Sequence, residues 1–471
     1  MFLHATVSLA AATAAHGPNP IYDAHPTLVK HVANGVHYYV AGPDSANVDI
    51  LHVYGNAFQR GEAQGLLLGT QLLDFIGPQL DGFYFEQFTE LIGGCLEPGQ
   101  PCKLPKWLVA AIRLLAPTIK RDAPKAFELA LAWLEELQRP YNNASAAHVY
   151  DEMDGIAQGT CASETVRMDG RECDTASLRT KLHRVNVLTD LIRMQCTVLG
   201  AWGKATPDGK LVQLRALDFG NGPFANASYL LVHHPSAESD ARAADSSAPQ
   251  PFASVTFPGF VGVVTGLSPS IALSEKVNDL TNGGTPPGSY HGQNTAFVLR
   301  DMLQFGTGKA SAVSIAQKAE RTWGIWLGVG DATEGRLEVI RYDKAAADTF
   351  DDSTLPALTG KPELADVAYV DKHPQPSTRD GSLQEAVTSR YGQLNAATVA
   401  QNLPRLHKTG DVHIMVVDYA TNHLLIAIGS TSANNTFVGP GGRKAYRAPF
   451  LRFSCEQLWK EARPEHLLRL T

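Results

Sequence analysis

The sequence is short of charge, of basic patches and of metal-binding motifs. Only 18% of its 471 residues are charged, 44% are apolar, and the net charge is −7. No basic stripe of the kind that binds nucleic acid is present, so we exclude nucleic acid as a partner. No segment beyond the N-terminus reads as a membrane-spanning helix. The chain has neither an H-E-x-x-H nor a C-x-x-C motif, and we expect no metal and no cofactor.

The first residues, MFLHATVSLAAATAAHGPNP, form a short apolar run that ends in small residues before a proline. This pattern predicts a secretory signal at residues 1–15. Three N-glycosylation sequons begin at Asn143, Asn226 and Asn434. Together these features predict a secreted or lysosomal glycoprotein.

Cysteine is scarce as well, with six in the chain: Cys95, Cys102, Cys161, Cys173, Cys196 and Cys455. If one of them is a nucleophile, five remain, and two disulfides leave one over. Cys95–Cys102 and Cys161–Cys173 are the nearest pairs along the chain. Proximity in sequence does not establish pairing, so the connectivity stays open.

The hydrophobic period changes at Cys196. Before it, apolar residues at helical spacing predict helices within residues 56–140, 148–164 and 177–195. After it, alternating segments predict hairpins within residues 196–219, 322–343 and 411–430, with helices within 294–306 and 310–320. A strand-rich part with segregated helices indicates an α+β fold of packed layers.

Cys196 opens the first of these hairpins, and its thiol is either an inert core group or a nucleophile. A free thiol needs a base to take its proton. The base could be a histidine, of which His183 is the nearest upstream, or the cysteine's own α-amino group after a cut before residue 196. If Gly203 faces Leu211 across the turn, Cys196 faces about Asp218, within two residues. Asp218 could then orient the amine.

At these residues the sequence resembles the N-terminal-nucleophile hydrolases, in particular the acid ceramidase and N-acylethanolamine acid amidase group and the penicillin acyltransferase-like (choloylglycine hydrolase-type) proteins. The family pattern Cys-Thr-Ser, Asp/Lys-Gly, Gly-Arg-Asn-x-Asp stands here as CTVLGAW…PDGKLVQLRALDF. Cys196, Arg215 and Asp218 match it, whereas Leu214 and Ala216 depart from it. Segments 53–69, 150–159, 257–278 and 296–307 also resemble family segments, in the family's order.

The resemblance implies a four-layer αββα sandwich with a mostly helical N-terminal segment. It also implies a precursor that cuts itself between Gln195 and Cys196. The products would be a segment of residues 16–195 and a catalytic segment of residues 196–471, which remain associated. The implied activity is hydrolysis of an N-acyl amide, such as a ceramide- or N-acylethanolamine-like lipid, through an acyl-enzyme. The apolar faces of the early helices either pack on the sandwich or contact lipid at a membrane surface.

Further site residues follow only from the resemblance. Glu275 and Lys276 match an acidic and a basic residue that serve precursor cleavage or line the mouth of the site, and Ser274 stands in place of a family asparagine. Asp371 stands where the family has the asparagine of its oxyanion hole, and Arg390 matches a late arginine for which Arg379 competes.

An ionised Asp371 would repel a tetrahedral oxyanion. Three explanations stay open: Asp371 is protonated, another donor such as Lys372 or a backbone amide replaces it, or the activity differs. The alternative functions are therefore an acyltransferase, in which an amine takes the acyl group, and a non-catalytic descendant that binds acyl ligands.

Overall fold

The structure is a computed structural model that describes residues 17–83, 123–191, 195–220, 222–236, 248–279, 288–322, 324–377 and 381–464. No helix in these ranges is both long and apolar enough to cross a bilayer. The elements before residue 195 are β1 (Ile21–Asp23), β2 (Thr27–Val32), β3 (Gly35–Ala41), η1 (Pro43–Ser45), β4 (Asn47–Gly55), α1 (Ala57–Leu68), α2 (Thr70–Asp74), η2 (Phe75–Gln79), α5 (Ala123–Ala162), α6 (Glu164–Met168), α7 (Thr175–Asn186) and η3 (Leu188–Asp190).

The elements from residue 195 onward are mostly strands. They are β5 (Gln195–Gly203), β6 (Gly209–Asp218), α8 (Phe224–Ala227), β7 (Tyr229–Pro235), β8 (Phe252–Thr256), β9 (Thr265–Leu267), β10 (Ile271–Val277), α9 (Thr295–Phe305), α10 (Lys309–Lys318), β11 (Ile325–Asp331), β12 (Arg336–Tyr342), β13 (Ala347–Phe350), α11 (Leu355–Thr359), β14 (Val367–Val370), α12 (Gly381–Thr388), α13 (Ala396–His407), β15 (His413–Asp418), β16 (His423–Ile428), η4 (Ala445–Arg447), β17 (Phe450–Ser454) and α14 (Cys455–Lys460).

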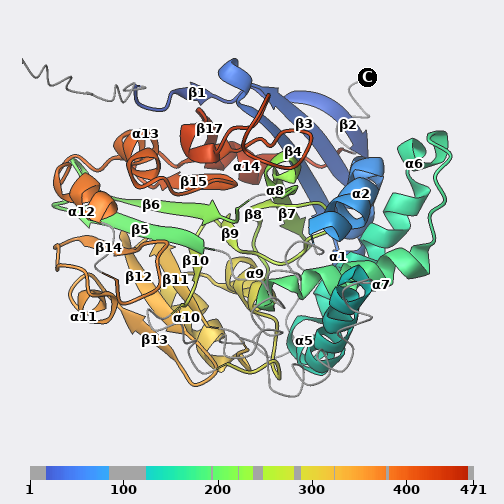
Figure 1. Cartoon of the computed structure of the whole chain (residues 1–471), viewed down its shortest axis with the longest axis horizontal. Coiled ribbons are helices and arrows are strands. Elements are labelled where there is room, and N and C mark those ends of the chain that lie inside the picture. Colours follow the sequence, from blue (N-terminus) through green and yellow to red (C-terminus); the bar gives the residue numbers. More distant parts are fainter. Residues whose placement is uncertain are drawn as a thin grey trace, which may run out of the picture.

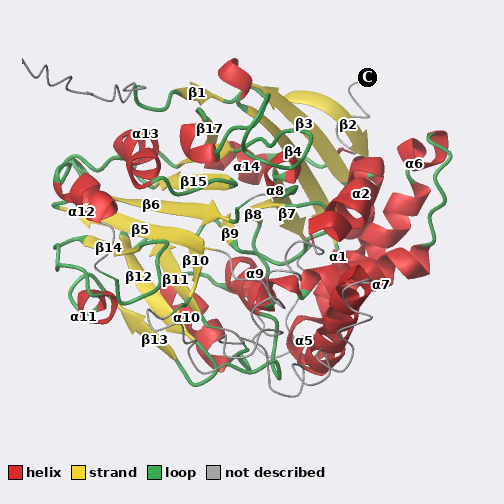
Figure 2. Ribbon diagram, viewed as in Figure 1, coloured by secondary structure: helices red, strands yellow, loops and turns green. Residues whose placement is uncertain are grey.

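The strands form two sheets that lie face to face (Figure 1). One sheet has the order β1-β17-β16-β15-β6-β5-β14, and the other has the order β13-β12-β11-β10-β9-β8-β7-β4-β3-β2. In the left half of Figure 2, the layers follow one another from top to bottom as α13, the β5–β6–β15 sheet, the β10–β12 sheet and α10. The predicted α+β class and αββα layering are confirmed.

The period-two alternation of β15 shows how the sequence builds the layers. Ile414 and Val416 pack against α12 and α13 on the outer face, whereas Met415 and Val417 enter the core between the sheets. An outer cluster on the other sheet joins β10, β11 and β12 to α9 and α10. Each sheet therefore buries both faces, and any polar group between them lies in a water-poor environment.

Helices α1 and α5 cross closely because each presents two glycines at i, i+4 spacing. A Cβ on Gly61 would lie 1.9 Å from the Glu152 backbone oxygen, and one on Gly155 would lie 2.1 Å from the Phe58 oxygen. Gly65 and Gly159 meet similar backbone contacts. These glycines belong to the segments 53–69 and 150–159 singled out in the sequence, and they have a packing role.

The N-terminal segment differs from the predicted, mostly helical one in its first forty residues. Its strand β1 pairs with β17 in one sheet, and its strand β4 pairs in parallel with β7 in the other. Its helices α1, α5 and α7 gather at one end of the molecule, on the right in Figure 1. Cys161 and Cys173 form a disulfide within this segment, while Cys95 and Cys102 lie outside the described residues.

Candidate active site

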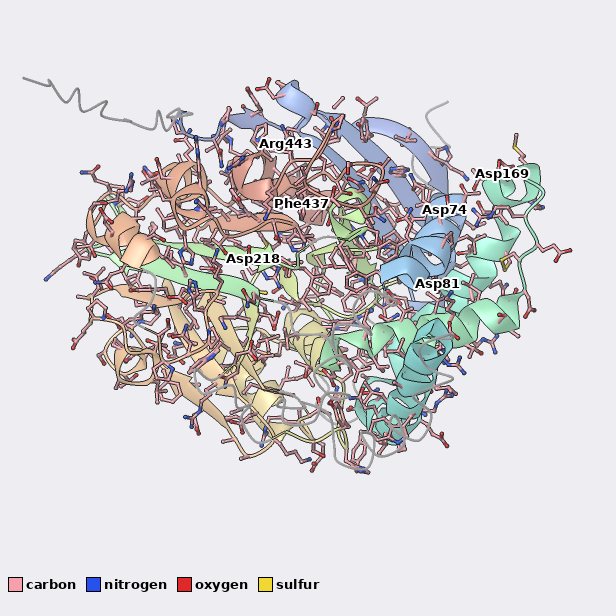
Figure 3. All side chains as sticks on the ribbon, in the orientation of Figure 1. Asp74, Asp81, Asp169, Asp218, Phe437 and Arg443 are labelled. Carbon is pink, nitrogen blue, oxygen red and sulfur yellow. A yellow bond between two sulfur atoms is a disulfide. The ribbon has the colours of Figure 1, made fainter. Side chains whose placement is uncertain are left out.

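Cys196 lies at the start of β5, and the chain is continuous through the Gln195–Cys196 bond. The β5–β6 hairpin has the predicted turn, but its register differs by one residue from the expected one. Cys196 faces Leu217, and Gln195 faces Asp218. Figure 3 shows Asp218 at the tip of the β6 arrow, near the centre of the molecule. The carboxylate therefore lies opposite the residue before the predicted cut, whereas the hairpin arithmetic placed it opposite the residue after the cut.

The space between the sheets holds the thiol, a guanidinium and a carboxyl group in mutual contact. Arg215 Nη2 donates to Cys196 Sγ over 3.3 Å and to Glu275 Oε2 over 3.3 Å. The thiol itself lies 4.0 Å from Glu275 Oε2. Cys196 and Arg215 are 0% exposed, and Glu275 is 3% exposed. Three residues predicted from the sequence therefore meet at one point, although they come from three strands.

Burial sets the protonation of this cluster. It raises the pKa of the Cys196 thiol, while the charge of Arg215 acts in the opposite direction. Burial also raises the pKa of Glu275 to about 7, against the lowering effect of Arg215. Lys276 is buried too, and burial lowers the pKa of its ammonium group, which donates to the Val277 carbonyl over 2.8 Å. The raised pKa values favour a protonated Cys196 thiol and place the titration of Glu275 near neutral pH.

Asp218 lies on the other face of the sheet, toward α13. Its Oδ1 accepts from the Gly410 backbone N–H over 2.8 Å, and its Oδ2 accepts from Thr409 Oγ1 over 2.5 Å. Thr409 in turn contacts the hydroxyl of Thr197 over 2.7 Å. Burial and the nearby Asp411 carboxyl raise the pKa of Asp218 to about 7. Because side chains alternate along a strand, the Asp218 carboxylate and the Arg215 guanidinium lie on opposite faces of the sheet.

Asp371 follows β14 and lies at the level of Thr197, because Val370 pairs with Val198. Its carboxylate forms a buried ion pair with Lys361 and accepts from the His373 backbone N–H over 2.9 Å. Burial favours the neutral acid, but the hydrogen bond and charge of Lys361 outweigh it and lower the pKa of Asp371. This argues against a protonated Asp371. Lys372 donates to the Lys408 carbonyl over 2.8 Å and not to this carboxylate.

The structure does not bring Arg390 or His183 to Cys196. Arg390 donates to the Ala386 carbonyl. Two residues after Arg390, the Gly392 N–H donates to the Ala205 carbonyl at the far end of the β5–β6 hairpin. Seven residues of strand separate Gly203, at that end of the hairpin, from Cys196, or roughly 23 Å. His183 Nε2 lies 3.4 Å from Asp154 in the helical end of the molecule. Arg379 lies outside the described residues.

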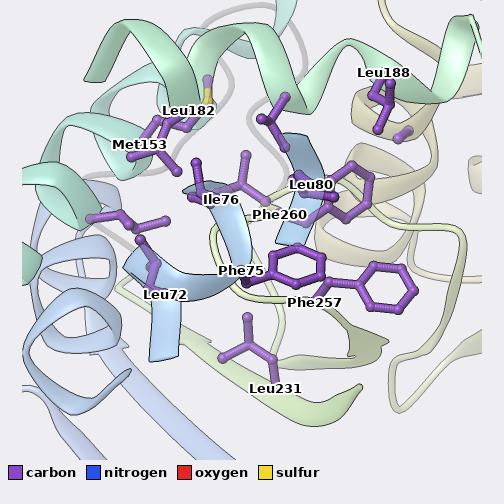
Figure 4. Packing of buried hydrophobic residues seen from close by; sticks show 14 of the residues in the cluster. Leu72, Phe75, Ile76, Leu80, Met153, Leu182, Leu188, Leu231, Phe257 and Phe260 are labelled. Atoms are coloured by element: carbon purple, nitrogen blue, oxygen red, sulfur yellow. The ribbon is translucent and has the colours of Figure 1, made fainter. Parts of the chain in front are cut away.

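An apolar pocket lies within the hydrophobic cluster that includes Cys196. Cys196 belongs to the hydrophobic cluster that Figure 4 shows around Phe75, Leu80 and Phe257. The Phe75 and Phe257 rings stack with centroids 6.2 Å apart. The open space among the side chains is about 40 Å³. Its lining residues come from both sides of the Gln195–Cys196 bond: Phe75, Leu80, Val185, Leu188, Thr189, Phe219, Phe224, Phe257, Phe260 and Val264. No cluster of His, Cys, Asp or Glu in the described residues is arranged to hold a metal.

No family model matches the chain. Among curated proteins, it is similar to protein dcd1B of Dictyostelium discoideum, with 28% identity over 464 residues, covering 94% of this chain and 81% of that protein. It is also similar to protein dcd1A of the same organism, with 29% identity over 423 residues, covering 88% of this chain and 86% of that protein.

Among solved structures, it overlaps a Caenorhabditis elegans N-acylethanolamine-hydrolyzing acid amidase ortholog at 14% identity and a TM-score of 0.33, over 55% of this chain and all of that one. Penicillin V acylase from Agrobacterium tumefaciens overlaps at 11% identity and a TM-score of 0.33, over 50% of this chain and 84% of that one. A conjugated bile acid hydrolase from Clostridium perfringens overlaps at 10% identity and a TM-score of 0.27, over 55% of this chain and 96% of that one. These overlaps are loose, so we base the functional proposal on the geometry around Cys196.

Sequence reasoning missed several residues that contact the site residues. They are His413 and Thr265 near Arg215, Thr409 near Asp218, and Lys361 beside Asp371. His413 and Thr409 come from segments distant in sequence from Arg215 and Asp218, Thr265 contacts His413, and Lys361 lies ten residues before Asp371. Thr265 lies inside the family-like segment 257–278 and could have been noticed there, but nothing in the local pattern marks the others.

Proposed function

We propose that this protein is a self-processing amidohydrolase whose nucleophile is Cys196, freed by a cut of the Gln195–Cys196 bond. The observation that carries the proposal is the contact of Arg215 Nη2 with Cys196 Sγ at 3.3 Å, at the start of a strand where Asp218 faces Gln195. A guanidinium against the sulfur favours the thiolate, and a carboxylate beside the new chain end can hold its amine.

The cut begins when the Cys196 sulfur adds to the Gln195 carbonyl carbon and its proton passes to Glu275, 4.0 Å away. The C–N bond of the peptide breaks, the Cys196 nitrogen takes a proton, and a thioester joins Gln195 to the sulfur. Water then hydrolyses the thioester, which releases the Gln195 carboxylate and leaves Cys196 with a free thiol and a free amine.

Turnover uses that amine as the base, because its ordinary pKa near 8 is close to that of a thiol. The thiolate attacks the amide carbonyl, the leaving amine takes the proton, and a thioester to the acyl group remains. Water then releases the acid. Arg215 stabilises the thiolate, and Asp218 orients the amine from the opposite face of the strand.

The apolar pocket supports an N-acyl amide with an apolar acyl group, such as a ceramide- or N-acylethanolamine-like lipid. Burying such a chain among aromatic and aliphatic side chains contributes about 0.8 kcal/mol per methylene group. The open space now holds only a few atoms, so we expect the side chains around it to move when the acyl chain enters. Because the pocket is lined from both sides of the cut, it also supports two fragments that stay associated.

The surroundings of Asp371 favour the two alternative functions, an acyltransferase and a non-catalytic protein that binds acyl ligands. The Asp371 carboxylate, paired with Lys361, can only accept where the family places the amide donor of its oxyanion-hole asparagine. If the cut chain binds N-acyl amides without hydrolysing them, the non-catalytic reading is correct, and if added amines accept the acyl group faster than water, the acyltransferase reading is correct. The exposed sequon residues Asn143 and Asn434 support our proposal that the protein is a secreted or lysosomal glycoprotein.

The test is a denaturing gel with N-terminal sequencing. We expect fragments of about 180 and 276 residues (195 − 15 and 471 − 195), the second beginning at Cys196. Cys196→Ala should stay uncut and inactive, whereas Cys455→Ala, which removes another buried thiol, should be cut normally. A wild-type preparation that hydrolyses N-acyl amides while remaining one chain would refute the proposal.

A further inference from the structure

His413 packs behind the guanidinium that contacts the nucleophile. The residue opens β15, is 0% exposed, and projects into the space between the sheets. Its Nε2 lies 3.3 Å from Arg215 Nη1 and 3.0 Å from Thr265 Oγ1. A guanidinium can only donate, so the contact with Arg215 is a hydrogen bond in the tautomer whose Nε2 carries the lone pair and whose ring proton sits on Nδ1.

The imidazole is neutral for a physical reason. Burial and the charge of Arg215 lower the pKa of His413 well below its ordinary value. Protonation would place two positive charges 3.3 Å apart in a water-poor core. His413 therefore differs from the histidine base that a cysteine nucleophile often uses, because the guanidinium stands between the ring and the sulfur.

The charged groups around this cluster come from three strands. Arg215 belongs to β6, Cys196 to β5, and Glu275 and Lys276 to β10. The Phe257 ring, 6.0 Å from the imidazole, and the Thr265 hydroxyl complete its surroundings. Glu275 competes with the sulfur for Arg215 Nη2, since both lie 3.3 Å from that nitrogen.

A guanidinium is planar and rigid, so an acceptor that fixes Nη1 also fixes the position of Nη2. We propose that His413 is a positioning residue: a neutral acceptor that holds the Arg215 guanidinium in place so that its other nitrogen stays against the Cys196 sulfur. Thr265 braces the ring from the neighbouring sheet. The inference rests on the proposed function, since it assigns a role within the same site.

The test compares thiolate formation at Cys196 in the wild-type protein and in variants. The rate of Cys196 alkylation by iodoacetamide is measured from pH 5 to pH 10, with the modified residue identified by mass spectrometry. In His413→Phe, which keeps a ring but removes the acceptor, we expect the midpoint to rise by about one pH unit, so alkylation below the midpoint slows about tenfold. His413→Gln, whose amide oxygen can accept, should recover part of the shift. The kcat for an N-acyl amide should fall with KM unchanged.

His52→Phe is the matched control, because His52 is also a buried histidine of lowered pKa, but its partner is His234. It should leave the midpoint unchanged. A folded His413→Phe with the wild-type profile, or an equal shift in His52→Phe, would overturn the proposal. If His413→Phe does not fold, Thr265→Val decides: a smaller upward shift supports the bracing of the ring, and an unchanged profile overturns the role of His413. The denaturing gel tests the proposed function separately. A wild-type chain that stays uncut would refute the proposed self-processing hydrolase, but the alkylation rates of wild type and variants could still be compared to test the role of His413.

Discussion

The substitution Glu152→Gln tests how the two sides of the proposed cut are held together. Glu152 on α5 is 1% exposed, and its Oε2 lies 2.6 Å from Arg300 Nη2 and 3.3 Å from Arg60 Nε. His233 Nε2 lies 3.0 Å from Oε1. Burial opposes ionisation, but the charges of Arg300, His233 and Arg60 outweigh it, and the pKa of Glu152 lies well below its ordinary value. Arg60 and Glu152 precede the cut, whereas His233 and Arg300 follow it.

Glutamine in this position removes the carboxylate that the two buried guanidinium groups contact. Breaking a buried ion pair by removing one partner typically costs about 3–5 kcal/mol. An unfolding entropy of about 2.1 cal/mol/K per residue gives about 1 kcal/mol/K for a chain of this length, so a loss of about 4 kcal/mol lowers the melting temperature by about 4 °C. In the cut protein, the same loss weakens the contact between the fragments.

The assay uses the uncut Cys196→Ala chain for calorimetry and the cut chain for gel filtration in rising urea. Glu152→Gln should melt about 4 °C lower and should release its fragments at a lower urea concentration. Glu320→Gln is the control, because Glu320 pairs with Lys344 at the surface with a 71% exposed side chain. If both variants melt together, or if the fragments of Glu152→Gln separate no earlier than those of the wild type, the buried network does not hold the two segments.

Three further predictions concern stability. Gly61→Ala should lower the melting temperature of the uncut chain by the equivalent of about 1–3 kcal/mol, because the new Cβ would collide with backbone atoms of α5. Gly82→Ala is the control and should leave the melting temperature unchanged, because its new Cβ would meet no atom within 4 Å. Equal melting temperatures for the two variants would contradict the close crossing of α1 and α5. Replacing Cys161 and Cys173 together by serine removes a link across 12 residues and should cost up to about 3 kcal/mol in urea unfolding, and a wild-type midpoint would contradict this. Burial raises the pKa of Asp190 to about 6, above its unfolded value, so its stabilising contribution is present below about pH 4 and is lost as pH rises through 6. Asp190→Asn should therefore gain stability relative to the wild type between pH 4 and pH 6, by at most about 3 kcal/mol, and a pH-independent difference in melting would refute the assignment.

The sequence predicted the elements that depend on neighbouring residues. The hairpins of β5 with β6, β11 with β12 and β15 with β16 follow from alternating residues around turn residues, and the structure confirms them. Helices α9 and α10 follow in the same way from their helical period. The strands β1–β4 were missed. The pairings of β1 with β17 and of β4 with β7 join distant segments and leave no local signal, but β2, β3 and β4 pair with one another in sequence order and were overlooked.

The site shows the same division. Motif resemblance singled out Cys196, Arg215 and Glu275, and they meet within 4.0 Å. Resemblance also named Arg390, but helix α12 and the residues after it pack at the opposite end of the β5–β6 hairpin. A motif gives the order of residues, whereas distance depends on how the elements between them pack.

By itself, the sequence supplied the candidate site residues, since motif resemblance alone singled out a thiol, a guanidinium and two carboxyl groups at these positions. Only the tertiary structure decided which face each one occupies. A register one residue different from the expected pairing places Gln195 opposite Asp218, and strand alternation sends the sulfur and the Asp218 carboxylate to opposite sides of the sheet. The tertiary structure also decided that His413 lies against Arg215 and that Lys361 pairs with Asp371. Both contacts depend on how the elements pack and not on any local pattern of residues.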